Sequence, residues 1–65
     1  MDAEARETAA MKEVTHRLLT IYGHDRDPEE VTETISSIHS RFDGHPIRDF
    51  VPVLVERYAR QDLSA

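Results

Sequence analysis

The first apolar residues of the chain recur every three or four positions, which is the repeat of one face of an α-helix. Two more apolar residues flank this stripe. The stripe and its flanking pair are Met11, Val14, Leu18 and Ile21, with Leu19 and Tyr22. The pattern predicts a helix over residues 8–22. Gly23 follows directly, and we expect it to end the helix in the left-handed conformation that glycine adopts readily.

A second helix is predicted over residues 28–42. Asp27 is suited to cap its start, and Pro28 falls at the first helical position, where its fixed backbone angle fits. Glu30 completes the spacing of a capping box. The apolar stripe that follows consists of Val31, Ile35, Ile38 and Phe42. The sequence 43–46 then reads as a turn, with Gly44 as the expected stop.

The third helix is predicted over residues 49–61 and contains the densest apolar run of the chain. Asp49 is the expected N-cap, and Pro52 lies in the first turn, where its missing N–H has no intrahelical partner. The residues after 61 are expected to fray, although Leu63 could pack back onto the apolar surface. The predicted core stripe of this helix consists of Ile47, Val51, Leu54 and Tyr58.

The apolar arc of the third helix is wider than one buried face requires. Phe50 and Val53 lie on one side of the predicted stripe, and Val55 and Ala59 lie on the other. The whole arc covers roughly 240°, against the roughly 100° typical of a helix that buries one face. Such a helix needs cover on two sides. The second cover is either another molecule or the chain's own loops and N-terminus.

Short connections between three helices predict a single all-α domain over residues 1–65, folded as an up-down-up three-helix bundle with shallow crossing angles. A chain of 65 residues is close to the lower limit for a stable core. It contains no cysteine, so disulfides and thiolate metal sites are excluded. Regular helix packing and pairing with a second molecule remain as sources of stability, and we expect a dimer.

The charge of the chain argues against nucleic acid as a partner. It has 13 acidic and 8 basic residues, for a net charge of −5. The helix that would have to read DNA is the apolar third one, and only Arg48, Arg57 and Arg60 favour that function. The sequence has no apolar segment of membrane-spanning length and begins with an acidic stretch unlike a signal peptide, so we expect a cytoplasmic protein that does not bind membranes.

Candidate catalytic and metal-binding groups are scattered. No two of the four histidines, His16, His24, His39 and His45, share a helix face through a spacing of three or four. The paired carboxylates Glu29, Glu30 and Glu33 are explained by a charged helix surface. We therefore expect no metal, no cofactor, no small-molecule substrate and no enzymatic activity.

The run Arg-Asp-Phe-Val-Pro-Val-Leu-Val-Glu-Arg, residues 48–57, resembles a bacterial family, the three-helix bundle dimerisation domain. Members occur at the N-terminus of low-molecular-weight phosphatase-like and arsenate-reductase-like proteins, and also as free-standing small proteins. Residues 14–42 fit the family by helix length and spacing. The resemblance implies a helical bundle that pairs with a copy of itself or with a related domain. It carries over no catalytic residue, because the phosphatase domain and its cysteine-containing phosphate loop are not in this sequence.

Three hypotheses follow. The first is a non-enzymatic protein–protein association module that forms a homodimer through Phe50, Val53, Leu54 and Arg57 of the third helix. The second is a regulatory partner protein that uses the same surface to associate with a related helical domain on an enzyme or transcription factor. The third, which the acidic charge opposes, is a small nucleic-acid-binding regulator.

Overall fold

The computed structural model describes residues 3–65, and within them it has three helices and no strand. They are α1 (Ala3–Tyr22), α2 (Pro28–Arg41) and α3 (Val51–Ser64). The predicted all-α three-helix bundle is therefore confirmed. Residues 1–2 of the predicted domain lie outside the described residues. α1 begins at Ala3, five positions before the predicted start, because the alanine-rich stretch ahead of Met11 continues the same helix.

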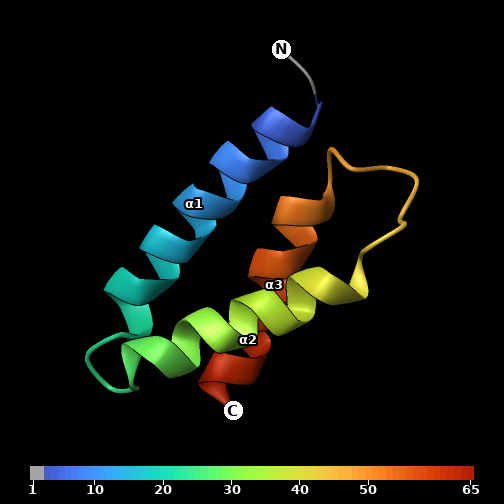
Figure 1. Ribbon diagram of the computed structural model, residues 1–65. Coiled ribbons are helices and arrows are strands. Elements are labelled where there is room, and N and C mark those ends of the chain that lie inside the picture. Colours follow the sequence, from blue (N-terminus) through green and yellow to red (C-terminus); the bar gives the residue numbers. More distant parts are fainter. Residues whose placement is uncertain (1–2) are drawn as a thin grey trace.

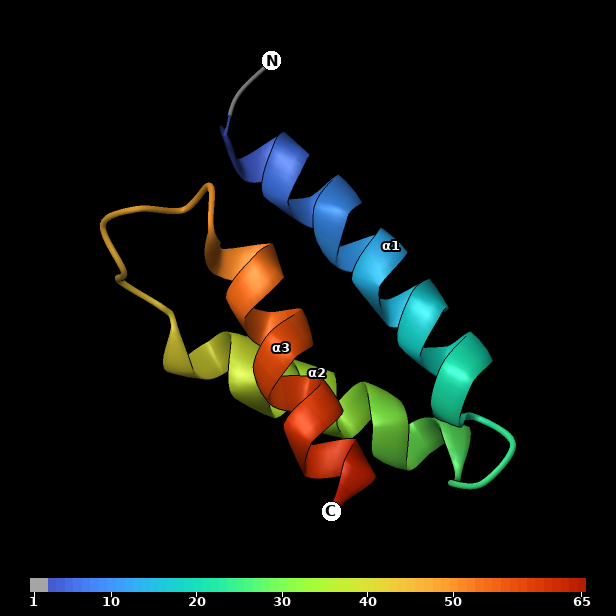
Figure 2. The same ribbon diagram turned by 180° about the vertical axis from the view of Figure 1, so that it is seen from behind.

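Helices α1 and α3 run in the same direction (Figure 1). Helix α2 leads from the end of α1 to the connection that precedes α3. In both views α2 crosses α3 obliquely, with α3 in front when the molecule is seen from behind (Figure 2). The shallow, coiled-coil-like crossing expected from the spacing is therefore wrong for this pair. The oblique crossing gives a body with extents of 35 × 20 × 15 Å.

Ten buried apolar side chains from all three helices form one core. They are Met11, Val14, Leu18, Val31, Ile35, Ile38, Val51, Val55, Ala59 and Leu63. The predicted stripes of α1 and α2 are largely confirmed, with one exception at the end of each. Ile21 is 43% exposed, and Phe42 is only half-buried at the edge of the core. Both lie in the last turn of their helix or just beyond it.

The buried side of α3 differs from the prediction. Ile47, Leu54 and Tyr58 do not enter the core, whereas Val55 and Ala59 are completely buried. The observed stripe repeats every four residues from Val51 to Leu63 and includes Pro52. At about 100° per residue it is centred roughly one residue's rotation, about 100°, from the predicted stripe.

Helix α3 also starts later and ends later than predicted. Its N-cap is Phe50, with no side-chain hydrogen bond, so the expected cap at Asp49 is wrong and Pro52 sits at the second helical position. At the other end the helix continues to Ser64 instead of fraying after residue 61. Burial of Leu63, which is 4% exposed, holds the last turn in place.

The side chain of Arg26 caps this last turn from the α1–α2 connection. Its Nε donates to the carbonyl oxygen of Leu63 at 2.8 Å, and its Nη2 donates to that of Ala65 at 3.0 Å. Its Nη1 donates to Glu30 at 2.8 Å, and the Tyr22 hydroxyl hydrogen-bonds Ser64 at 2.9 Å. At the start of α2, Glu30 therefore forms an ion pair with Arg26 in place of the predicted capping box. At the end of α3, Arg26 gives a cationic donor to backbone carbonyls that have no partner within the helix.

The connections between helices follow the turn chemistry in part. Asp27 caps α2 by accepting the N–H of Glu29 at 2.9 Å, and Gly44, the expected stop, follows the C-cap Phe42 by two residues with a positive φ of 82°. Gly23 does not, so its predicted left-handed conformation is wrong. It is required for a different reason, since a Cβ there would lie 2.3 Å from the carbonyl oxygen of Leu19.

None of the helices in residues 3–65 combines the length and the apolar character needed to cross a membrane.

Candidate functional site

The outer side of α3 carries a group of apolar side chains that the core does not use. Phe50 is 60% exposed, Val53 is 64% exposed and Tyr58 is 44% exposed. Leu54 is half-buried among them, and Arg57 is exposed. We define the α3 face as these five residues, which span less than half of the helix circumference on the side away from Val55 and Ala59. Figure 2 shows α3 in front of α2.

All four residues predicted as a dimer interface, Phe50, Val53, Leu54 and Arg57, therefore lie on the α3 face. The alternative in which the chain's own loops and N-terminus bury Phe50 and Val53 is contradicted within the described residues by their exposure. Ile47, 53% exposed, extends the apolar surface beyond the start of the helix.

Sequence reasoning missed Ile47 and Tyr58 as surface residues because it placed them in the core stripe. Tyr58 instead lies at the edge of the α3 face, where its ring stacks on Phe42 with centroids 6.1 Å apart and planes inclined by 24°. The signal that could have found them is the repeat of four from Val51 through Val55 and Ala59 to Leu63. It becomes visible only when the helix is extended past residue 61.

A cluster of charged side chains fixes the segment that leads into the α3 face. Arg48 donates from Nε and Nη2 to the two carboxylate oxygens of Glu7, at 2.8 and 2.6 Å. His39 Nε2 lies 2.7 Å from the same carboxylate, and Arg48 Nη1 also donates to the carbonyl oxygen of Phe42. The cluster ties α1, α2 and the α2–α3 connection together two residues before Phe50. A forked guanidinium–carboxylate pair of this kind restrains orientation as well as distance.

The hydrogen bonds from Arg48 and then from His39 lower the pKa of Glu7 from 4.5 to about 2. The hydrogen bond to Glu7 raises the pKa of Arg48 in turn. Because the folded-state pKa of Glu7 lies below its unfolded value, ionised Glu7 stabilises the fold fully above about pH 4.5. That contribution is lost as the pH falls from 4.5 toward about 2.

Replacing Glu7 by Gln is expected to lower the free energy of unfolding by about 1 kcal/mol at pH 7, since the cluster is partly open to solvent. The difference between variant and wild type is expected to shrink as the pH falls below 4.5 and to vanish near pH 2. Urea unfolding followed by circular dichroism between pH 2 and 7 measures it. Glu13→Gln, an exposed change on the same helix, is the control. An equal pH dependence in the two variants would contradict this function of Glu7.

A second group of ion pairs, centred on Glu56 of α3, links α3 to α1. Glu56 accepts Arg17 at 2.8 Å and, through its other oxygen, Arg60 at 2.9 Å. Glu56 has 16% of its side chain exposed. The ion pair of Glu56 with Arg17 is formed with α3 rotated so that Val55 and Ala59 face the core.

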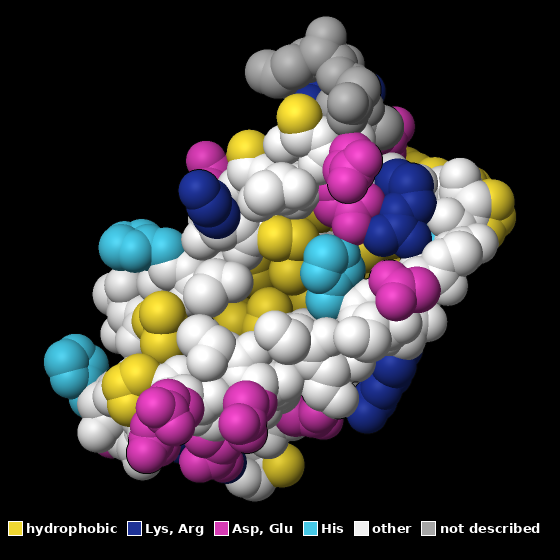
Figure 3. Space-filling model, in the orientation of Figure 1, with side chains coloured by type: hydrophobic (Ala, Val, Ile, Leu, Met, Phe, Trp, Pro, Cys, Tyr) yellow, Lys and Arg dark blue, Asp and Glu magenta, His cyan; other side chains and the backbone are white. Residues whose placement is uncertain are grey.

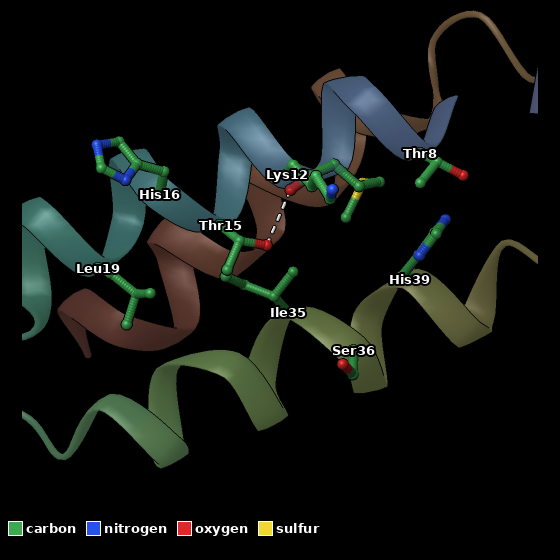
Figure 4. Close-up of a pocket in the computed structure, with 9 residues that line it drawn as sticks. Thr8, Lys12, Thr15, His16, Leu19, Ile35, Ser36 and His39 are labelled. Atoms are coloured by element: carbon green, nitrogen blue, oxygen red, sulfur yellow. Dashed lines mark hydrogen bonds between the residues drawn. The ribbon is translucent and has the colours of Figure 1, made fainter. Parts of the chain in front are cut away.

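The opposite side of the molecule has a groove between α1 and α2. Figure 3 shows hydrophobic side chains at the bottom of this hollow. Its volume is about 460 Å³, and its lining includes Met11, Leu19 and Ile35 with Lys12, His16 and His39 at the rim. Figure 4 shows the α1 and α2 side chains on either side, with the Thr15 hydroxyl turned back to the carbonyl of Met11 at 2.8 Å. Met11 and Ile35 are buried core residues, so the groove offers little free apolar surface.

The histidines lie apart in the structure. His39 is held by Glu7, and a ring nitrogen of His45, Nδ1, lies 3.2 Å from the backbone nitrogen of Ile47. In the part of the chain that the structure describes, no group of three or more histidine, aspartate or glutamate side chains could hold a metal ion.

Comparisons of the chain with protein-family models, with curated proteins and with solved structures found no match. The fold and the exposed α3 face are therefore the observations on which a functional conclusion rests.

Proposed function

We propose that the chain is a non-enzymatic association module that forms a homodimer through the α3 face. The observation that carries this proposal is the exposure of Phe50, at 60%, and Val53, at 64%, on a helix whose opposite side already fills the core. Large apolar side chains gathered on one helix face are typical of a protein–protein contact. The cluster around Arg48 supports it, because it restrains the backbone that presents Phe50.

The size of the α3 face favours a modest affinity. A standard interface buries about 800 Å² on each partner, which would be about a sixth of the 4599 Å² surface of this chain. One face of a helix of 14 residues offers less than that. We therefore expect a dissociation constant in the micromolar range, and pairing that depends on a few anchors such as Phe50.

The absence of catalysis and a cytoplasmic location belong to the same proposal. The most organised polar group in the described residues, Glu7 with Arg48 and His39, has its atoms engaged in joining three segments of the fold.

Sedimentation equilibrium from low micromolar to millimolar concentration tests the homodimer. The wild type is expected to shift from monomer to dimer mass, whereas Val53→Glu weakens pairing at least about 100-fold, because it places a charge without a partner in the contact. Ile21→Glu is the matched control, since Ile21 is exposed apolar surface on α1 outside the α3 face. Circular dichroism checks that both variants fold.

A Val53→Glu variant that pairs as tightly as the wild type would contradict the placement of the interface. A wild type that remains a folded monomer at millimolar concentration would overturn the homodimer. That result would favour the second hypothesis, in which the α3 face binds a related helical domain of another protein.

A further inference from the structure

Arg57 is the one charged residue of the α3 face, and it lies on nearly the same line along the helix as Phe50, seven positions earlier. Among the described residues it forms no ion pair, whereas Arg17, Arg48 and Arg60 each pair with a carboxylate. A guanidinium placed in the middle of an apolar contact needs a partner group that the chain itself does not provide.

A two-fold contact through the α3 face has two possible helix directions. If the two α3 helices run parallel, each residue meets its own copy, so Arg57 meets Arg57 and like charges are brought together in an interface that excludes water. If they run antiparallel, residues equidistant from the two-fold axis on opposite sides meet instead. Parallel pairing is therefore opposed by the position of Arg57.

The apolar residues of the α3 face are centred on Val53 and Leu54, so a two-fold axis beside these two residues covers the face most evenly. Phe50 precedes Val53 by three positions, and Arg57 follows Leu54 by three. In the antiparallel arrangement Arg57 of one copy thus faces Phe50 of the other, and the contact occurs twice. A guanidinium over an aromatic ring is a favourable cation–π arrangement, and the methylenes of arginine cover apolar surface. The α3 face is self-complementary in this direction.

We propose that two copies of the chain pair with antiparallel α3 helices, so that Arg57 of each copy lies over the ring of Phe50 of the other. This inference rests on the proposed homodimer and adds its direction and its central contact. The dipoles of two antiparallel helices point in opposite directions and attract each other, which also favours this arrangement.

The chain has no cysteine, so a single introduced cysteine reports the pairing without interference. Leu54→Cys places the thiol beside the axis and is expected to form an intermolecular disulfide on mild oxidation. Gln61→Cys replaces an exposed polar residue farther along the same line of α3. In the antiparallel dimer its two copies lie about 22 Å apart along the helix, at 1.5 Å per residue, which is too far for a disulfide.

The same Gln61→Cys variant, carrying a nitroxide label, gives a second measurement by pulsed electron resonance. A distance distribution centred beyond about 20 Å is expected for the antiparallel dimer. Efficient disulfide formation at Gln61→Cys, or a label distance as short as neighbouring helices allow, would overturn the proposal in favour of parallel pairing.

Sedimentation of the unmodified wild type separates the antiparallel arrangement from the proposed homodimer on which it rests. A monomer there means that the homodimer itself fails. A wild-type dimer in which neither cysteine variant cross-links means that the axis does not lie beside Leu54, and the antiparallel contact of Arg57 with Phe50 is then wrong.

Discussion

Replacing Val55 by Asp is expected to unfold the chain, whereas Val53→Asp, two residues earlier on the same helix, leaves it folded. Val55 is fully buried and Val53 is 64% exposed. The change at Val55 loses about 1.5–3 kcal/mol of apolar burial and adds the cost of a buried carboxylate without a partner. A domain of this size has a total stability of about 3–10 kcal/mol, so a combined loss of about 5 kcal/mol or more removes half of that stability at the upper end of the range and all of it at the lower end.

Far-ultraviolet circular dichroism and urea unfolding at low micromolar concentration measure both variants. Val53→Asp is expected to keep the helical spectrum and a midpoint close to that of the wild type. If Val53→Asp unfolds the chain and Val55→Asp does not, the rotation of α3 about its axis in the structure is wrong.

Leu18→Ala has the second-largest expected effect, a loss of about 3 kcal/mol in the free energy of unfolding. Leu18 is completely buried and is among the largest fully buried side chains of the core. Truncation removes its apolar contacts and leaves a cavity that three packed helices close only in part.

Ile21→Ala is the matched control, because Ile21 belongs to the same predicted stripe but is 43% exposed. Its expected cost is below about 1 kcal/mol, since most of its surface already meets water. Denaturant titration of both variants at one protein concentration gives the comparison. Equal losses at the two positions would mean that Ile21 contributes to the core as the sequence pattern predicts.

The periodicity of α1 and α2 was enough to predict their cores, because each of these helices is apolar on one side only. The cap at Asp27 and the turn at Gly44 were also predictable, since both depend on residues that are neighbours in the sequence. The residue at which α3 ends was not predictable from the local sequence. It depends on Arg26, whose guanidinium reaches Leu63 from 37 positions away.

Four of the five residues of the α3 face were predictable from the sequence, but Tyr58 and the surroundings of the face were not. The width of the apolar arc places Phe50 and Val53 outside the core whichever stripe is chosen. The pairing of Arg48 with Glu7 spans 41 positions and leaves no local pattern. Ile47 and Tyr58 were assigned to the core because a helix that is apolar on more than one side offers two stripes, and spacing alone does not rank them.

That ambiguity is also a property of the folding landscape. A rotation of α3 by about 100° would exchange one apolar stripe for another, so two packings of the same helix compete for the same core. The structure discriminates between them with polar and small residues: Glu56 reaches Arg17 in only one rotation, and fully buried Ala59 lets the helices approach where Tyr58 would hold them apart. These contacts act mainly as specificity elements. They widen the energy gap to a misrotated state and keep the native packing unique in a chain with little apolar surface to spare.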